Sequence, residues 1–233
     1  MTLVLVPSPQ STVKANLSAG FSIIKYTGNG SNGATVGHGL GVKPDFILIK
    51  KRDNNSGGNT GNWIAQHKSL TNGVNATSAL FTLTSYSNAA IYLNGNFNQS
   101  SYVFDNQVNG NTDTFVAYCF SEVAGYSKFG SYTGNGSSDG TFVFTGFRPA
   151  WIMTKRTDSS GDWYIYDNKR PEFNVNNILI SPHNDRAEIS YTSLDILSNG
   201  FKLRNTGTDI NASGGTIIYL AFAESPFKNA RAR

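Results

Sequence analysis

The sequence contains one long internal repeat. The pentapeptide Tyr-Thr-Gly-Asn-Gly at residues 26–30 returns at residues 132–136, after 106 positions. A turn and apolar strand at residues 41–50 and a closing strand at residues 114–122 also return, 105 and 102 positions later. A period of about 100 residues is the size of a domain and not of a short solenoid repeat. The sequence therefore predicts a tandem duplication of one domain.

The repeat separates scaffold from function. Residues that build the domain should occur in both copies, whereas a group that chemistry or binding needs only once should lie where the copies differ. The interval between matching segments drifts from 106 to 100 positions, which indicates loops of different length between fixed strands. Divergent loops on a shared scaffold are where binding specificity is expected.

Both copies consist of short apolar or alternating segments separated by turns. Asn-Gly, Gly-Asn, Ser-Gly and Gly-Gly pairs lie between these segments and supply the positive-φ residues that tight hairpins need. Strands at this spacing are typical of sandwiches and barrels. The closing strands at residues 114–120 and 216–222 are apolar on both faces, so we expect each to be the central strand of its domain.

The predicted fold is all-β, with two tandem antiparallel β-sandwich domains of jelly-roll-like type packed together. The join at residues 123–128 contains no proline-rich or charged linker, and direct packing is expected for that reason. The expected organisation is an extended N-terminal anchoring arm at residues 1–19, a first β-sandwich repeat at 20–122, a second at 123–227 and a basic C-terminal tail at 228–233.

Few residues of this chain are charged. Asp, Glu, Lys and Arg make up 15% of the 233 residues, against a usual value of about 25%, so solubility rests on neutral polar turns. This composition is typical of β-rich extracellular or virion proteins. The net charge is +4 with the basic residues spread along the chain, and no nucleic-acid partner is expected. No apolar run reaches the length of a membrane span, and no membrane insertion is expected.

The sequence carries no recognisable catalytic motif. It has no H-E-x-x-H, C-x-x-C or G-x-S-x-G pattern, and its 15 carboxylates show no spacing that suggests a glycosidase pair. We therefore predict neither an enzyme nor a cofactor. The single cysteine, Cys119, corresponds to Ala221 in the repeat, which predicts a small buried side chain.

Two Asp-Asn turns offer oxygen ligands. Residues 53–55 and 105–107 carry side chains of the kind that calcium prefers, but their spacing matches no known calcium loop. No metal site is predicted, and calcium binding by either domain stays open.

The predicted contact residues are aromatic and polar residues that do not recur. Aromatic residues at matching positions, such as Trp63 and Trp163, are assigned to the core. The candidates for receptor contact come from the divergent stretches, and they are Asn54, Asn55, Tyr86, Tyr92, Phe97, His183 and Tyr191.

Several long motifs are similar to those of a known family. They are residues 20–30, 36–41, 44–50, 124–136, 146–151 and 221–228. In these motifs the chain resembles a domain family of unknown function that recurs in tail-fibre-like virion proteins of marine phages and cyanophages, here in two tandem copies. The resemblance extends over roughly residues 20–230 and implies no catalytic residues.

The resemblance implies a non-enzymatic virion structural protein. We expect a short tail fibre or receptor-binding subunit on the virion surface, homotrimeric, which binds a host surface glycan or protein. Its arm, with Leu3, Val4, Leu5 and Val6, would anchor it to other virion proteins of the tail adaptor, baseplate or capsid. Only about twenty residues precede the first repeat, whereas the domains of the similar family often end long tail-fibre-like proteins. A small accessory subunit therefore also agrees with the sequence. The alternative is a capsid decoration or cement protein, and a more remote one is a polysaccharide-degrading enzyme.

Overall fold

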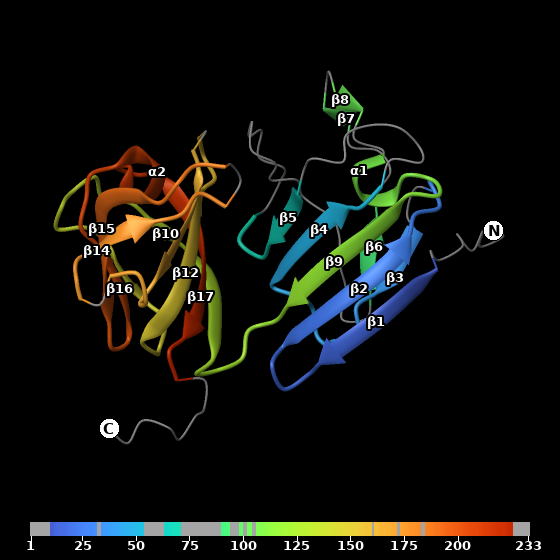
Figure 1. Ribbon diagram of the computed structural model, residues 1–233, viewed down its shortest axis with the longest axis horizontal. Coiled ribbons are helices and arrows are strands. Elements are labelled where there is room, and N and C mark those ends of the chain that lie inside the picture. The colour runs from blue at the N-terminus through green and yellow to red at the C-terminus, as the bar shows by residue number, and fades with distance from the viewer. Residues whose placement is uncertain are drawn as a thin grey trace. The chain divides into compact units, whose positions relative to one another are not determined.

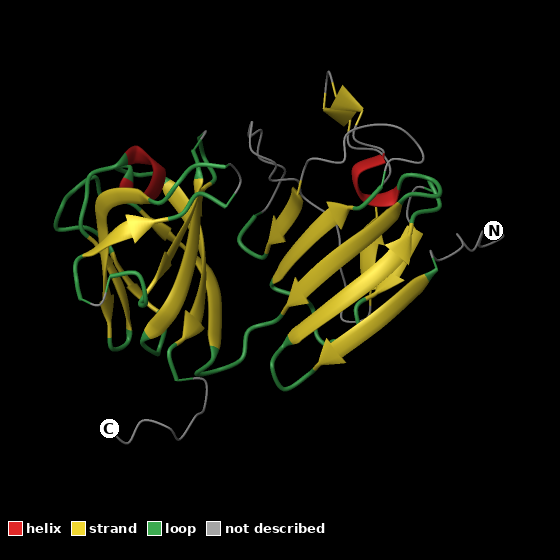
Figure 2. Ribbon diagram, in the orientation of Figure 1, coloured by secondary structure: helices red, strands yellow, loops and turns green. Residues whose placement is uncertain are grey.

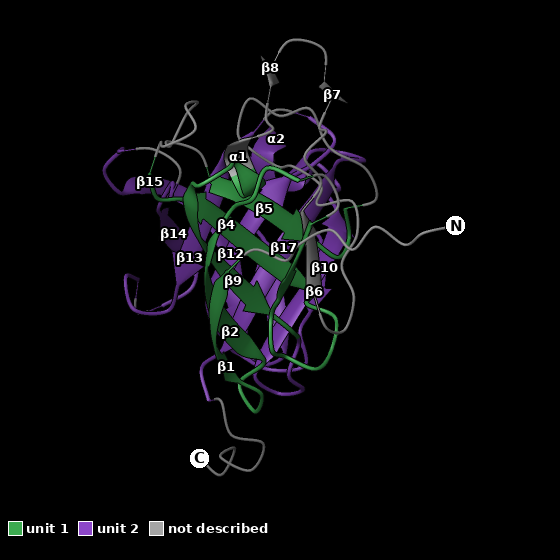
Figure 3. Ribbon diagram, turned by 90° about the vertical axis from the view of Figure 1, so that its right-hand side faces the viewer, with its two compact units in different colours: residues 1–73, 79–121 green, residues 74–78, 122–233 purple. Residues whose placement is uncertain are grey.

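The structure is a computed structural model in which the chain divides into two compact units (Figures 1 and 3). Among the residues described, unit 1 ends at Ser121 and unit 2 begins at Glu122, one residue from the boundary expected from the repeat. The structure describes residues 10–31, 34–53, 63–70, 90–93, 98–99, 102–103, 106–159, 161–171, 173–182 and 185–225, and of these it describes only the backbone at 90–93, 98–99, 102–103 and 106–107.

Unit 1 is built on one five-stranded antiparallel sheet. Its strand order is β1 (Ser11–Asn16), β2 (Phe21–Thr27), β9 (Thr114–Phe120), β4 (Phe46–Lys51) and β5 (Trp63–His67). The remaining elements are the strand pair β3 (Ala34–Gly37) with β6 (Ala90–Leu93), the pair β7 (Asn98–Gln99) with β8 (Tyr102–Val103), and the short helix α1 (Asn106–Asn109). One hydrophobic core joins the main sheet, β3 and α1.

Unit 2 has two four-stranded antiparallel sheets around one core, as in a β-sandwich. The main sheet has the order β10 (Ser127–Thr133), β17 (Thr216–Ala223), β12 (Pro149–Arg156) and β13 (Trp163–Asp167). The second sheet has the order β11 (Phe142–Phe144), β16 (Gly200–Leu203), β15 (Ile189–Leu197) and β14 (Asn176–Leu179). The helix α2 (Thr208–Asn211) completes the unit.

The expected all-β class is confirmed, because α1 and α2 are the only helices among the described residues (Figure 2). The two main sheets also share one strand order, since β2-β9-β4-β5 corresponds to β10-β17-β12-β13. The closing strands β9 and β17 each pair with a neighbour on both sides. Their predicted central position is therefore confirmed, and it follows from the apolar residues on both of their faces.

Among the described residues, the main sheet of unit 2 contains no counterpart of the strand β1. It pairs with β2 over its whole length, from Ser11 with Tyr26 to Asn16 with Phe21. The sequence assigns residues 1–19 to a separate arm, but from residue 11 to residue 16 the structure places them in unit 1. The physical reason is that β2 would otherwise be an edge strand with unpaired backbone groups.

Candidate binding face

The repeated pentapeptide of unit 1 holds the end of β2 against the helix α1. The Tyr26 hydroxyl donates a hydrogen bond to the carbonyl oxygen of Val108 over 2.7 Å. The side chain of Asn109 accepts a hydrogen bond from the Asn29 amide and donates to Asn29 Oδ1 and to the Ser31 carbonyl, each over 3.0 to 3.1 Å. We call this arrangement the clasp, and every polar group of the Asn109 side chain is used in it.

Unit 2 contains the same clasp. The Tyr132 hydroxyl donates to the Ile210 carbonyl over 2.8 Å. Asn211 accepts from the Asn135 amide over 3.0 Å and donates to Asn135 Oδ1 and to the Ser137 carbonyl. Because the two units share these bonds, the repeated pentapeptide is scaffold, as expected for residues that both copies contain.

Glycine is required at the third position of the pentapeptide for a steric reason. A Cβ atom at Gly28 would lie 2.3 Å from the Gly110 carbonyl oxygen, and one at Gly134 would lie 2.3 Å from the Ala212 carbonyl oxygen. Both distances are well below van der Waals contact, so a side chain at either position would separate the pentapeptide from its helix.

The sequence reasoning missed the helical half of the clasp. Val108-Asn109 and Ile210-Asn211 lie 102 positions apart, the same interval that separates the closing strands. A pair of residues is a weak signal, and the short helices that carry them have no helical periodicity to reveal them. The matching interval is the signal that could have found them.

Of the seven predicted receptor-contact residues, only Tyr92 and Tyr191 are among the described residues. Asn54, Asn55, Tyr86, Phe97 and His183 lie outside the described residues, as do Leu3 to Val6 of the arm. Tyr92 is in β6, where its backbone pairs with Thr35, and its side chain is outside the description. Tyr191 is in β15 and is 47% exposed, with its hydroxyl group close to Gly207.

The outer face of the second sheet of unit 2 carries two exposed aromatic side chains. Phe142 and Phe144 are both in β11 and are 44% and 63% exposed, whereas Val143 between them is buried in the core. Since side chains alternate along a strand, Phe142 and Phe144 project from the same face, away from the core. An exposed pair of large apolar side chains on one strand is a feature that folding alone does not require.

Glycines next to these rings keep the face flat. Gly200 is directly opposite Phe144 in the β11–β16 register, and a Cβ atom there would lie 2.1 Å from the Val143 carbonyl oxygen and 3.2 Å from the Phe142 ring. A Cβ atom at Gly146 would lie 3.8 Å from the Phe144 ring. Each ring therefore rests beside backbone that has no side chain to cover it.

Two ion pairs lie at the Phe142 end of this face. Lys202, which is directly opposite Phe142, pairs with Asp139 at 2.8 Å, and Arg204 pairs with Asp195 at 2.6 Å. The hydrogen bond and the charge of Lys202 lower the pKa of the Asp139 carboxyl group, which is solvent-exposed. We call the set of Phe142, Phe144, Gly200, Lys202, Arg204, Asp139 and Asp195 the β11 face.

Unit 1 lacks these aromatic residues. The interval of 105 positions that relates residues 41–50 to residues 146–155 also relates His38 to Val143, and both of these side chains are buried. At the same interval, Gly37 and Gly39 occupy the positions of Phe142 and Phe144. The β11 face therefore satisfies the criterion drawn from the repeat, because it lies where the copies differ.

Sequence reasoning read residues 141–144 as one more strand and did not select the two phenylalanines. Both faces of an apolar strand look alike in a sequence, and burial of only the middle residue cannot be seen there. The usable signal was the contrast between Phe-Val-Phe in the second copy and Gly-His-Gly at residues 37–39 in the first.

The described residues contain no group of three or more His, Cys, Asp and Glu side chains that could hold a metal ion. Neither of the two short helices found in the described part of the chain has the length and hydropathy to cross a membrane. Cys119 is fully buried, as predicted, and burial raises the pKa of its thiol to about 12. At neutral pH this thiol is therefore protonated and poorly nucleophilic.

An all-β protein with sandwich-like architecture and an exposed aromatic face is the class that these observations define. The chain belongs to the family described as Domain of unknown function (DUF7483), whose model matches residues 7–226. The family model matches once across both units and not once for each unit. No curated protein and no solved structure matches the chain significantly.

Proposed function

We propose that this protein is a non-enzymatic structural protein of a phage virion that contacts the host surface, as a short tail fibre or receptor-binding subunit. The sequence motifs that resemble those of tail-fibre-like virion proteins support the virion setting. The single structural observation that carries the receptor role is the exposed pair Phe142 and Phe144 on a scaffold that unit 1 builds without them.

The argument for contact is energetic. Each phenylalanine leaves a large part of its apolar surface in water, and burial of such surface on binding is favourable by about 25 cal/mol for each Å². Aromatic residues, phenylalanine among them, are enriched in binding interfaces. A rigid strand supports Phe142 and Phe144, so little conformational entropy is lost when a partner covers them.

We further propose that the two units arose by duplication of one ancestral domain and that unit 2 later acquired its binding face. The shared strand order of the main sheets and the shared clasp support this proposal. A homotrimer would present several β11 faces together, and multivalent attachment would then strengthen weak individual contacts.

Binding of the purified, fluorescently labelled chain to host cells tests the receptor role. We expect saturable binding by the wild-type chain and at least a ten-fold weaker affinity for the double variant Phe142→Ser/Phe144→Ser. Phe173→Ser is the matched control, because Phe173 is 80% exposed and is held beside β15 by the bonds of Asn174 to Ile196. Equal binding by the double variant and the wild type would contradict the proposed site.

A variant of Tyr191 separates the two candidate contact regions. If Tyr191→Ser weakens binding while Phe142→Ser/Phe144→Ser does not, the contact predicted from sequence is the correct one and the β11 face is not. The opposite result supports the β11 face.

The second candidate function is capsid decoration, and the strand β1 is the observation that favours it. Five of the six residues of β1 are exposed, so a segment near the N-terminus lies on the surface, where it could reach a neighbouring capsid subunit. Immunogold labelling of intact virions discriminates between the two candidates. Label at the tail supports the fibre, label over the whole shell supports decoration, and particles without label would contradict both.

A further inference from the structure

We propose that the β11 face binds a neutral glycan, with sugar rings stacked on Phe142 and Phe144 and sugar hydroxyl groups bonded to the ion pairs beside them. This inference rests on the proposed receptor-binding function and names the chemical class of its ligand. The argument uses the spacing of the rings, the bare backbone beside them and the balance of charge.

The spacing of Phe142 and Phe144 suits two successive sugar rings of one oligosaccharide. Phe142 and Phe144 are two residues apart on one strand, so their Cα atoms are separated by about 7 Å. Successive sugar rings of an oligosaccharide can each cover one such side chain. The apolar face of a sugar ring, made of C–H groups, is attracted to the negative face of an aromatic ring.

The bare backbone keeps the platform accessible. The Phe142 ring lies 3.2 Å from the Cβ position of Gly200, and the Phe144 ring lies 3.8 Å from that of Gly146. Larger residues at these positions would cover the rings or push them out of place. Position 200 tolerates only glycine, because its Cβ atom would meet the Val143 carbonyl oxygen at 2.1 Å.

The charges on the β11 face balance one another. Its two cations, Lys202 and Arg204, are paired with its two anions, Asp139 and Asp195, at 2.8 and 2.6 Å. A charged ligand would have to break these pairs to find a partner, whereas a neutral one need not. The pair of Lys202 and Asp139 still exposes polar atoms, since the Asp139 side chain is 82% exposed, and sugar hydroxyl groups both donate and accept hydrogen bonds.

This combination favours a glycan over an apolar peptide. A peptide that added a strand to the edge of β11 would use backbone hydrogen bonds and would need no ordered charge pairs beside the aromatic rings. Two rings with ion pairs beside Phe142 instead match a ligand that is apolar on its ring faces and polar around its rim. Sugars have that distribution of surface.

The experiment uses the full chain and the surface polysaccharide of the host. Mild acid releases oligosaccharides, and anion exchange separates them into a neutral and an anionic fraction. Saturation-transfer difference NMR then measures the binding of each fraction. We expect the neutral fraction to bind, about ten-fold weaker binding for Phe142→Ser and for Phe144→Ser, and unchanged binding for Phe173→Ser.

Conservative variants keep the test informative if a serine variant is poorly folded. Phe144→Tyr retains the ring and should retain binding within about two-fold, whereas Asp139→Asn removes the charge that holds Lys202 and should weaken binding several-fold. Circular dichroism and gel filtration establish that each variant is folded. Loss of binding by Phe144→Tyr equal to that by Phe144→Ser would contradict stacking.

The outcomes separate failure of this inference from failure of the proposed function. Binding to cells that depends on Phe142 and Phe144, without binding of the neutral fraction, would indicate a protein or charged receptor and overturn the glycan. Binding of only the anionic fraction overturns it too. Dissociation of an oligomer by Phe142→Ser/Phe144→Ser would make the face a contact between copies of this chain. No binding to cells at all would instead refute the receptor function.

Discussion

Units 1 and 2 are most alike at the clasp and differ most on the outer faces of β3 and β11. The clasp repeats bond for bond, from the tyrosine hydroxyl to the asparagine side chain of the helix. On the same scaffold, Gly37 and Gly39 in one unit stand where Phe142 and Phe144 stand in the other. The motif that is most visible in the sequence therefore marks structure, and the difference that suggests function is hidden in three residues of a short strand.

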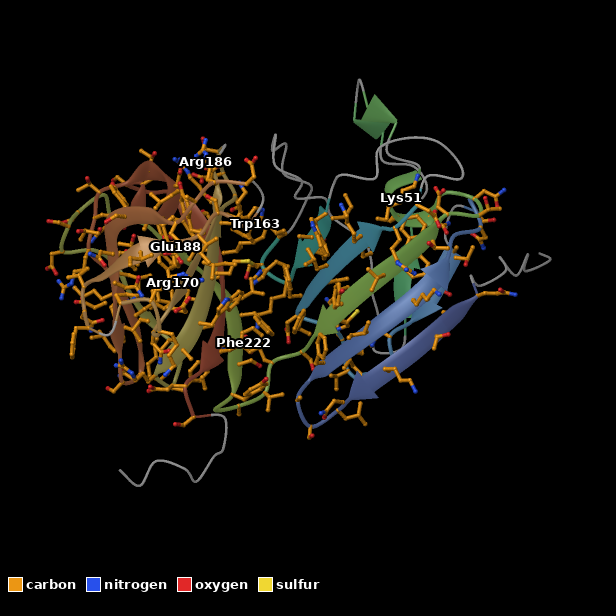
Figure 4. All side chains as sticks on the ribbon, viewed as in Figure 1. Lys51, Trp163, Arg170, Arg186, Glu188 and Phe222 are labelled. Atoms are coloured by element: carbon orange, nitrogen blue, oxygen red, sulfur yellow. The ribbon has the colours of Figure 1, made fainter. Side chains whose placement is uncertain are left out.

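The strand ends next to the helices show a second difference. Lys51, at the end of β4 (Figure 4), forms an ion pair of 2.7 Å with Asp113, and both side chains are fully buried. Arg156, at the end of β12, pairs instead with Asp158 at 2.8 Å, where the two side chains are 18% and 39% exposed. The end of β4 in unit 1 thus carries a buried ion pair, whereas the corresponding end of β12 in unit 2 carries an ion pair that is partly exposed to solvent.

The largest expected effect is on the clasp itself. Gly28→Ala and Gly134→Ala each place a Cβ atom 2.3 Å from a carbonyl oxygen, so the pentapeptide must move away from its helix and lose its hydrogen bonds. We expect each change to destabilise its own unit by more than about 4 kcal/mol. Hydrogen exchange followed by mass spectrometry measures the two units separately. If one unit tolerates its alanine, the clasps are not equivalent.

The next effect should distinguish the units. Lys51→Met leaves the Asp113 carboxylate buried without its ion-pair partner, and the expected cost is about 3–5 kcal/mol in unit 1. Arg156→Met leaves Asp158 in contact with water, and the expected cost is below about 1 kcal/mol in unit 2. Denaturant melts of both variants, with hydrogen exchange to assign the unit, measure this contrast. Equal costs would show that burial of the pair is not what differs.

The sequence predicted the sheets better than the site. The strands β9 and β17 are apolar on both faces. This pattern predicts a central position in the sheet, because a strand covered on both faces needs apolar residues on both. The sequence did not predict β1. The six residues of this strand, Ser11 to Asn16, include few apolar side chains, and they form a strand because they pair with the edge of β2. Local pattern cannot show that kind of long-range pairing.

The candidate site was harder to predict for a different reason. Tyr191 and the other predicted contact residues lie in stretches that diverge between the copies, and this criterion passes over a strand that both copies possess. Phe142 and Phe144 are in a strand that both copies possess, and only their exposure distinguishes them from core residues. Exposure depends on which layer faces outward, and that is a property of the assembled sandwich.

Cys119 offers a smaller, pH-dependent contrast. Burial raises the pKa of its thiol from 9.0 to about 12, so its contribution to stability is complete below pH 9 and is lost as pH rises towards 12. At pH 10 the unfolded thiol is ionised, and unit 1 should have lost about 1.4 kcal/mol through this group. Comparison of Cys119→Ala with the wild-type chain at pH 8 and pH 10 isolates that loss from the tyrosine contributions.

The repeat supplies the matched control for this measurement. Ala221 corresponds to Cys119 and is likewise fully buried. The exchanged variant Cys119→Ala/Ala221→Cys should move the alkaline loss of stability from unit 1 to unit 2, provided that the added sulfur atom fits. A thiol reagent would then report the opening of unit 2 in place of unit 1. Rapid labelling of native Cys119 at pH 8 would contradict its burial.

The smallest expected effect on stability tests whether Phe142 and Phe144 serve binding and not folding. Phe142→Thr/Phe144→Ser should change the stability of unit 2 by less than about 1 kcal/mol, since surface substitutions seldom cost more. Val143→Ala, in the same strand, removes buried methyl groups and should cost more than the two outer changes together. Thermal melts of the three chains give the ranking. If Phe142→Thr/Phe144→Ser costs more stability than Val143→Ala, the two rings stabilise the sandwich. Their absence from unit 1 would then reflect a different core and not a different function. If they cost little and binding to host cells is lost, stability and function are separated within three consecutive residues, as the contrast between β3 and β11 requires.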